Sequence, residues 1–382
     1  MIAHARRKTL KDGQTRWYAV YVAPTGKRAE EGGFTTKREA ERVAHKRANE
    51  IERGEFIDAS MRSLTFSTYV ERYYWPATQH LEPTTRAAYR SYLDKHFLPR
   101  FGAMPLRRIA PSVIQAWVND AVAPNDPEIK PLSGRSVVKY HTFLHSVFKQ
   151  AAVDQAILTN PCSHTKLPKV VKKPKKAITP EQFDELLSHL DERHILMVLV
   201  AIETGLRWGE LIALHPADFD FVTNIITVQR VIMEVSKKIS PTGERMIVRD
   251  YPKDNEQRDV SITADLAKQI KEHMIASGVR DNDLLFPNSA GSPISRNTFR
   301  TRVWRPAVEA AGIEVPGSKR AVRFHDLRGA HASWLLAGGA DLKIVMDRLG
   351  HRQITTTQQY LGSLPDAGEK ALAAFNAVRK RS

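Results

Sequence analysis

Four short clusters in the second half of the 382-residue chain carry side chains that can bind an anion or transfer a proton to it. In the first, TGLRWGEL, Arg207 follows Gly205, which is predicted to end a buried helix, and Arg207 begins the next helix. A cation near a helix N-terminus is unfavourable unless an anion balances it, and Glu210, one turn later, can hold the guanidinium. The motif therefore fits either an anion-binding arginine or a plain surface Arg–Glu pair.

The second cluster, RFHDLRGAHASWLL, places His325 and Arg328 three residues apart, on one face of a predicted helix. Two donors that converge from one face suit a phosphate, because the planar guanidinium can donate two hydrogen bonds to its oxygens. Ala332, Trp334 and Leu335 are predicted to anchor this helix in a core. The HxxR spacing alone also occurs by chance, so its interpretation depends on the other clusters.

The third cluster, DYPKDNEQRDVSIT, predicts that Lys253 lies at the tip of a hairpin between two strands. A lysine on such a turn can reach a leaving oxygen and donate a proton to it. A solvated turn lysine is the alternative interpretation. Lys237 and Lys238 in VSKKIS could also fill the proton-donating role.

The fourth cluster, LGHRQITTTQQYLG, sets His351 directly after Gly350 and places Tyr360 nine residues later. Gly350 is predicted to end one helix, and ITTTQQ is predicted to begin another that bears Tyr360. A glycine-capped helix with an unrelated surface tyrosine nearby would give the same letters. Together, however, the four clusters set Arg, Lys, His-x-x-Arg, His and Tyr in one domain, in that order.

The charge balance favours a polyanionic partner. The chain has 58 Lys and Arg against 42 Asp and Glu, a net charge of +16. Each phosphate that is neutralised by Lys or Arg releases condensed counterions, which favours binding to nucleic acid. Binding to RNA or to a membrane surface would also fit, as would a basic protein with no such partner.

Other features exclude several classes of protein. The most apolar run, 195–202, is far shorter than the roughly 20 residues of a membrane span, and the N-terminus lacks the apolar stretch of a secretory signal. We therefore expect a cytoplasmic protein. The single cysteine, Cys162, excludes an intramolecular disulfide and a multi-cysteine zinc site. No HExxH or EF-hand pattern occurs, so we expect no metal and no cofactor.

Residues 1–60 are predicted to form a separate unit, a short β-sheet backed by one helix. RWYAVYVA and KRAEEGGFTT are predicted strands, and Thr36 with Glu39 forms a capping box that begins the helix. Basic residues near the strands could place a ribbon in a DNA groove, although a solvated sheet face is the alternative. These candidates for DNA contact are Arg6, Arg7, Lys8, Arg16, Lys27 and Arg28.

Residues 64–165 are predicted to form an all-α bundle of four helices. Four stretches of this region carry apolar residues at spacings of three and four, as one face of a helix does. The segment 166–177 is predicted to be an extended, basic linker, since prolines and like charges oppose regular structure. Its lysines could follow a phosphate backbone or remain solvated. They are Lys166, Lys169, Lys172, Lys173, Lys175 and Lys176.

Residues 178–382 are predicted to form the last domain, mixed but mainly α, with a small antiparallel sheet. Helices begin at a capping box from Thr179 to Gln182, and strand-like segments follow in NIITVQRVIMEV, RMIVRDY and RDVSIT before helices resume. The fold class predicted for the whole chain is multidomain, mainly α with α+β parts.

The ordered motifs TGLRWGEL, Lys253, HDLRGAHASWLL and LGHRQITTTQQY closely resemble those of the tyrosine recombinases, the phage integrase family. The resemblance covers 178–362 and extends to the bundle, which resembles the family's core-binding domain. The N-terminal unit resembles the arm-binding domain that integrases of temperate phages and integrative elements carry. One position departs from the pattern, because Asp254 replaces the threonine that often follows the lysine.

The resemblance implies a mechanism without ATP or metal. Arg207 and Arg328 would bind the scissile phosphate, and His325 and His351 would add hydrogen bonds to its oxygens. Tyr360 would attack phosphorus and form a 3′-phosphotyrosyl link, while Lys253 protonates the leaving 5′-hydroxyl. Glu210 would support Arg207. A partner strand's 5′-hydroxyl would then reseal the DNA.

The resemblance also implies partners: double-stranded DNA at core and arm sites, a homotetramer that works through a Holliday junction, a host DNA-bending factor and an excision directionality factor. In the family the C-terminal tail docks on a neighbouring protomer, and here packing on its own domain is the alternative. Two other functions stay open at this point. They are a topoisomerase-like nickase of type IB and a non-catalytic DNA-binding architectural or regulatory protein.

Overall fold

The computed structural model describes residues 3–24, 26–57, 61, 63–170, 177–250, 257–316, 320–351, 353–358, 360 and 376. The chain divides into two compact units, Met1–Val171 and Lys172–Ser382. The division falls within the segment 166–177 that was expected to be a linker. No helix among the described residues is long and apolar enough to cross a membrane.

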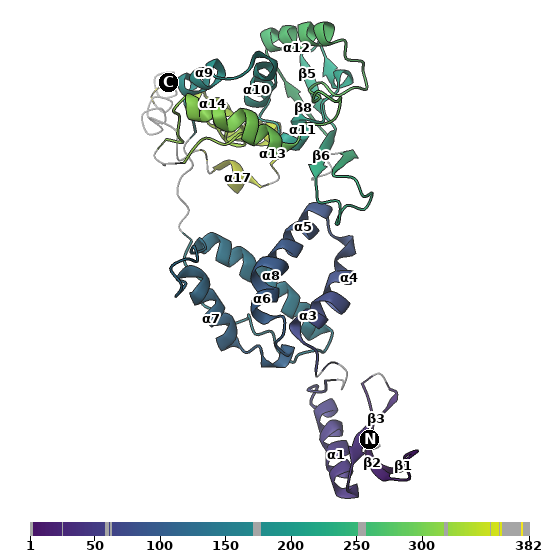
Figure 1. Cartoon of the computed structure of the whole chain (residues 1–382). Helices are drawn as coiled ribbons and strands as arrows, with labels where there is room; N and C mark the ends of the chain where they lie inside the picture. Colours follow the sequence, from purple (N-terminus) through teal and green to yellow (C-terminus); the bar gives the residue numbers. More distant parts are fainter. Residues whose placement is uncertain are drawn as a thin grey trace. The chain divides into compact units, whose positions relative to one another are not determined.

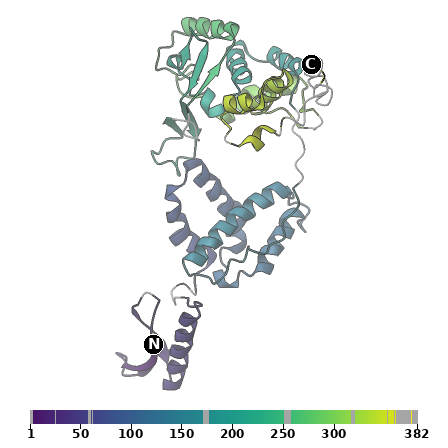
Figure 2. The same ribbon diagram turned by 180° about the vertical axis from the view of Figure 1, so that it is seen from behind.

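The first unit begins with a three-stranded antiparallel sheet and one helix (Figure 1). Strands β1 (His4–Thr9), β2 (Thr15–Val22) and β3 (Arg28–Phe34) are neighbours in that order. Helix α1 (Lys37–Glu52) starts at Thr36, whose side chain accepts a hydrogen bond from the backbone N–H of Glu39. Figure 2 shows α1 alongside the sheet from behind. The sheet-plus-helix prediction is confirmed, but β1 was missed because its sequence, HARRKT, is dominated by basic residues.

The remainder of the first unit is helical, as predicted. Among its described residues the four longest helical segments are α3 (Phe66–Tyr69) to α4 (Trp75–Ala77), α5 (Pro83–Tyr92) to α6 (Leu98–Phe101), α7 (Pro111–Val122) and α8 (Gly134–Val153). The first two segments are continuous through the π-helical turns η1 (Val70–Tyr74) and η3 (Leu93–Phe97). Each turn is followed two residues later by a proline, Pro76 or Pro99. Proline lacks an N–H and clashes with the carbonyl four residues earlier, which favours a local widening of the helix.

The start of the expected linker is attached to this bundle. The backbone N–H of Lys166 donates to Oε1 of Gln115 over 2.8 Å, and Nε2 of Gln115 donates to the Lys166 carbonyl over 3.2 Å. The side chains of Lys166 and Lys169 are exposed. The other four linker lysines, at 172, 173, 175 and 176, lie outside the described residues.

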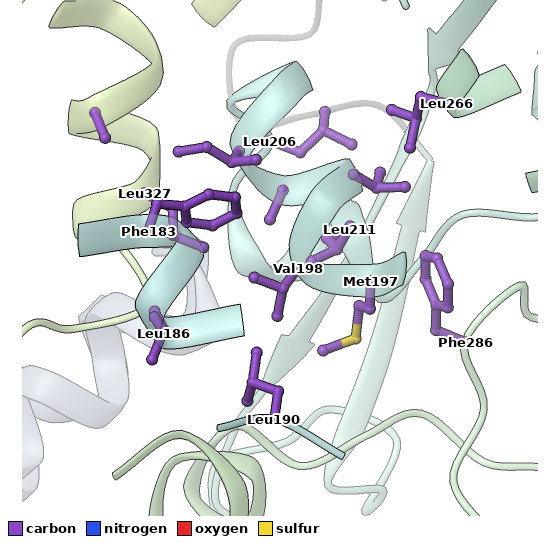
Figure 3. Packing of buried hydrophobic residues seen from close by; sticks show 14 of the residues in the cluster. Phe183, Leu186, Leu190, Met197, Val198, Leu206, Leu211, Leu266, Phe286 and Leu327 are labelled. Carbon is purple, nitrogen blue, oxygen red and sulfur yellow. The ribbon is translucent and has the colours of Figure 1, made fainter. Parts of the chain in front are cut away.

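The second unit contains a hydrophobic core to which both helices and strands contribute side chains (Figure 3). Met197 and Val198 of α10 (Glu192–Thr204) pack among Leu186 of α9 (Pro180–Ser188), Leu211 of α11 (Trp208–Leu211) and Leu266 of α12 (Ala264–Ser277). The predicted capping box of Thr179 and Gln182 is present at the start of α9. The helices that follow are α13 (Arg296–Phe299), η6 (Arg300–Trp304), α14 (Arg305–Ala310), α15 (Asp326–Ala337), α16 (Leu342–Leu349) and α17 (Ile354–Gln358).

The described strands of this unit form two antiparallel sheets, whereas one was predicted. One sheet has the order β4 (Phe219–Asp220), β5 (Ile225–Val228), β8 (Arg258–Ser261), and the other pairs β6 (Arg230–Glu234) with β7 (Met246–Asp250). The predicted hairpin around Lys253 is wrong in its pairing, because β7 pairs with β6 and β8 with β5. Lys253 itself lies outside the described residues, whereas Lys237 and Lys238 lie in the turn between β6 and β7.

Candidate active site

Two glycines end the helices that frame the site. Gly205 and Gly350 adopt left-handed φ values of 64° and 62° after α10 and α16, as both sequence motifs predicted. A Cβ on Gly205 would lie 2.7 Å from both Cδ2 of His331 and Cδ2 of Leu349. Only glycine therefore allows the end of α10 to approach α15 and the end of α16 this closely.

Arg207 is the N-cap residue of α11, and its side chain is 35% exposed. Its Nη1 donates to Oε1 of Glu210 over 2.9 Å, and its Nη2 donates to the carbonyl of Gly350 over 3.1 Å. The predicted Arg207–Glu210 pair is present. It is not a plain surface pair, however, because Glu210 is only 1% exposed.

The Glu210 carboxylate is buried and accepts four hydrogen bonds. Two come from Arg207, through its backbone N–H and its Nη1, and two come from Nη1 and Nη2 of Arg258 over 3.1 and 2.6 Å. Burial alone would raise the pKa of Glu210, but the hydrogen bonds and charges of Arg258 and Arg207 outweigh it and lower the pKa to about 2. Glu210 is therefore ionised at neutral pH.

Arg328 is buried inside the site, at 3% exposure. Its Nη1 donates to the carbonyl of Gly205 over 2.6 Å, and its Nη2 donates to the carbonyl of Leu349. Burial, with the nearby charge of Arg207, lowers the pKa of Arg328 to about 9. Arg328 remains a cation at neutral pH, held by the ends of two helices.

Three consecutive carbonyls at the end of α16 each receive a different arginine. The acceptor oxygens of residues 348, 349 and 350 bind Nε of Arg258, Nη2 of Arg328 and Nη2 of Arg207. The last carbonyls of a helix have no partner within it and carry the negative end of its dipole. The end of α16 therefore gathers three cations in one place.

The two histidines predicted for the site differ in exposure. His325 is exposed and is the N-cap residue of α15, which begins one residue later. His351 is partly buried, and its Nδ1 lies 2.9 Å from Oγ1 of Thr357. Burial and the charges of Arg328, Arg207, Arg258 and His325 lower the pKa of His351 to about 4. His351 is therefore neutral near pH 7, and its pKa is affected by the same arginines that surround the end of α16.

Tyr360 lies in a turn two residues beyond Gln358, the last residue of α17, whereas it was predicted to lie within the helix. It is 6% exposed and packs with apolar side chains of α15 and α16, among them Leu336 and Val345. A Cβ on Gly329 would lie 3.4 Å from Cε1 of Tyr360 and 4.0 Å from its hydroxyl oxygen. The tyrosine is thus docked in its own domain, against the residue that follows Arg328.

The motifs and their geometry agree with the comparisons to known proteins. The model of the phage integrase family matches residues 176–366, half of the chain, and the model of the N-terminal SAM-like domain of phage integrases matches residues 65–121. The chain belongs to the phage integrase family. Members of this family cleave and rejoin DNA strands, so the chain is a site-specific recombinase of the tyrosine type.

Individual relatives extend over most of the chain. The integrase named for prophage phiRv2 of Mycobacterium tuberculosis is 28% identical over 360 residues, which cover 90% of this chain and 88% of the relative. The solved Tn1549 transposon integrase in complex with transposon right end DNA has a TM-score of 0.66 at 17% identity, over 83% of this chain and 100% of that one. A lambda integrase tetramer bound to a Holliday junction has a TM-score of 0.55 at 20% identity, over 91% and 96%. These structural similarities show that the chain has the same fold as these integrases.

One site residue of this recombinase, Arg258, was missed by the sequence analysis. Its signal was present in the sequence, as an arginine that opens a predicted strand. Its partner could not be predicted from the sequence, because Arg258 and Glu210 are 48 positions apart and meet only in the folded domain. Among the described residues, no group of three or more His, Cys, Asp or Glu side chains is arranged to hold a metal ion.

The basic residues predicted to contact DNA in the N-terminal sheet lie mostly at its surface. Arg6, Arg7, Lys27 and Arg28 are exposed, and Lys8 and Arg16 are partly buried. Arg6 and Lys8, two residues apart on β1, both pair with Glu30 of β3. Alternation along a strand directs Arg7 to the opposite face. The six residues therefore do not form one uniform basic face.

Proposed function

We propose that the chain is an integrase that joins mobile DNA to a chromosome through a covalent 3′-phosphotyrosyl link on Tyr360. The observation that carries this proposal is the gathering of Arg207, Arg328 and His351 around the end of α16, with Tyr360 docked against the neighbouring turn of α15. A binding protein needs basic groups, but it has no use for a tyrosine held beside a buried arginine.

The arginines would supply the charge that a phosphodiester needs. The anionic oxygens of a phosphodiester repel nucleophiles, so the charge must be neutralised before attack. Arg207 is the more accessible of the two and would meet the phosphate first, while the buried Arg328 would bind it from within. His325 and His351 would donate hydrogen bonds to the remaining oxygens.

Tyr360 would then form the covalent link. Its Oη bonds to phosphorus, the bond to the 5′ oxygen breaks, and the 5′-hydroxyl leaves with a proton that Lys253 donates. The ordinary tyrosine pKa of about 10 is too high for ready attack, so the phenol must lose its proton in the site. The nearby charge of Arg328 favours the tyrosinate, and the phenol proton leaves to solvent.

Complete recombination would require four such sites. Each of two duplexes is cut on both strands, so we assign a homotetramer on core DNA, as in the lambda integrase tetramer bound to a Holliday junction. The sheet of residues 1–60 would bind arm sites, and the linker lysines would follow phosphates. A host DNA-bending factor and an excision directionality factor complete the proposed partners, all acting in the cytoplasm of a bacterial host.

The deciding experiment tests for the covalent intermediate. Fragmented DNA of the organism that encodes the chain is incubated with the protein, denaturation-resistant adducts are captured, and their sequences define the cleaved site. A duplex of that site, nicked so that the leaving strand diffuses away, should then accumulate a protein–DNA adduct. Tyr360→Phe should abolish the adduct. Tyr74→Phe is the matched control, because Tyr74 is equally buried, in the helical bundle.

Each other outcome would contradict a different part of the proposal. An adduct with Tyr360→Phe would disprove the proposed nucleophile. Binding of duplex DNA without any adduct in the wild type would favour the architectural or regulatory protein. Relaxation of supercoiled DNA without sequence preference would favour the topoisomerase-like nickase.

A further inference from the structure

Arg258 lies at the centre of the network that holds the proposed phosphate-binding arginines. It opens β8, and its side chain is 10% exposed. It donates two hydrogen bonds to the two oxygens of Glu210 and a third, over 3.0 Å, to the carbonyl of residue 348. A single, largely buried arginine thus connects β8, α11 and the end of α16.

The guanidinium also lies directly against Gly350. A Cβ on Gly350 would lie 3.4 Å from Cδ and from Nη1 of Arg258, and 3.5 Å from its Nε. Gly350 supplies the carbonyl that Arg207 binds, and the next residue is His351. Arg258 is therefore in contact with the supports of both Arg207 and His351.

The net charge of Arg207, Glu210 and Arg258 explains how Arg258 can support anion binding by Arg207. If Glu210 had Arg207 as its only cationic partner, the carboxylate would neutralise the charge intended for a phosphate. With Arg258 bound to both carboxylate oxygens, the three side chains carry one net positive charge. Arg258 thus allows Glu210 to orient Arg207 while Arg207 keeps its attraction for an anion.

We propose that Arg258 is a positioning residue for strand cleavage, which orients Arg207 through Glu210 and fixes the end of α16 from which His351 emerges. It acts without touching the DNA phosphate. The assignment rests on the proposed function, since it concerns the rate of phosphotyrosyl formation.

The test measures single-turnover cleavage of the nicked duplex by the full-length protein over a range of protein concentrations. Arg258→Gln should lower the saturating rate by about 10²-fold, the size of effect expected when a catalytic group is misplaced by about 1 Å. The half-saturating concentration should change little, because the substitution removes an interaction within the site and none with bound DNA. Arg258→Lys should recover part of the rate, because it keeps the charge but lacks the planar fork.

The matched control is Arg230→Gln. Arg230 lies in the same domain and pairs with another buried carboxylate, that of Asp218, through its Nη1 over 2.6 Å. Its removal disturbs a comparable ion pair without reaching Glu210. If Arg258→Gln is folded and cleaves as fast as Arg230→Gln, the assignment is overturned. If Arg258→Gln does not fold, the comparison of Arg258→Lys with Arg230→Lys decides, and equal rates overturn it. Absence of an adduct with the wild type overturns the proposed function, and this assignment with it.

Discussion

Arginines and lysines serve two regions of this molecule in opposite ways. On β1, Arg6 and Lys8 extend from a strand to a shared Glu30 near the surface. At the end of α16, Arg207, Arg258 and Arg328 are held by backbone carbonyls and by one buried carboxylate. The first arrangement can adapt to a long, irregular anion, whereas the second fixes charges at defined points.

The difference shows what a folded domain adds to a basic residue. Exposed ion pairs are screened by water and contribute little to stability. A buried cation has given up its hydration, so each of its donors needs an acceptor, and these acceptors determine its position. Catalysis requires defined positions, and binding to a backbone of phosphates requires mainly charge.

Replacing Arg328 by lysine should give the largest effect. Lysine keeps the charge but cannot reach both the Gly205 and Leu349 carbonyls, so the saturating cleavage rate should fall by about 10²- to 10³-fold. Single-turnover cleavage of the nicked duplex measures this rate. Arg305→Lys, at an exposed pair on α14, is the control and should cleave normally. A normal rate for Arg328→Lys would mean that charge alone is sufficient at the buried position too.

A smaller effect, on the free energy of unfolding, is expected from replacing His331, which lies beside the site. Nδ1 of His331 donates to the Ile202 carbonyl, its Nε2 accepts from Nε of Arg348, and burial with the charge of Arg348 lowers its pKa to about 3. The folded protein therefore keeps His331 neutral at pH values where the unfolded chain protonates it. This histidine's contribution to the free energy of unfolding is fully present above the ordinary histidine pKa of about 6.5, and it is lost as the pH falls from there towards 3.

His331→Gln should remove that contribution. Between pH 7 and pH 5 the free energy of unfolding should fall by about 2 kcal/mol less in the variant than in the wild type. Urea denaturation followed by tryptophan fluorescence measures the difference. His189→Gln, at an exposed i,i+4 pair with Glu185, should follow the wild type. Equal pH dependence in all three proteins would contradict a buried neutral His331.

The smallest effect on the catalytic unit should come from the N-terminal sheet. Changing both Arg6 and Lys8 to Gln should reduce the slope of log affinity for arm DNA against log salt by about 2, because each phosphate that a side chain neutralises adds close to 0.9 to that slope. Cleavage of the isolated core site should not change. Lys37→Gln, at an exposed pair on α1, is the control. A salt slope unchanged by the double substitution would count against DNA binding by β1.

Much of the site could be predicted from the sequence, because its parts are local. The glycine stops at 205 and 350 and the pairing of Arg207 with Glu210 follow from backbone geometry and helical spacing. Lys253 stays a prediction, because it lies outside the described residues, and the pairing predicted for the strands on either side of it was wrong. The pattern of a strand shows that it is a strand and not which strand is its neighbour.

What escaped prediction depends on contacts between distant segments. The contact of Arg258 with Glu210 was not predicted, and for Arg328 the residue was predicted but its burial against the ends of two helices was not. The burial of Tyr360 was likewise not predicted. Nothing in ITTTQQYLG shows that its ring will join a buried cluster with Leu336 and Val345 of the preceding helices. Such long-range contacts are set by the whole domain.

The three carbonyls at the end of α16 also affect how this site can change during evolution. Carbonyl groups belong to every residue, so aligned sequences would show conserved arginines without the groups that hold them. Most side chains could be exchanged there without removing an acceptor. A one-residue insertion or deletion between 342 and 350 would instead rotate the helix end by about 100°. Selection on this framework should therefore appear as a constant helix length and an invariant glycine at position 350.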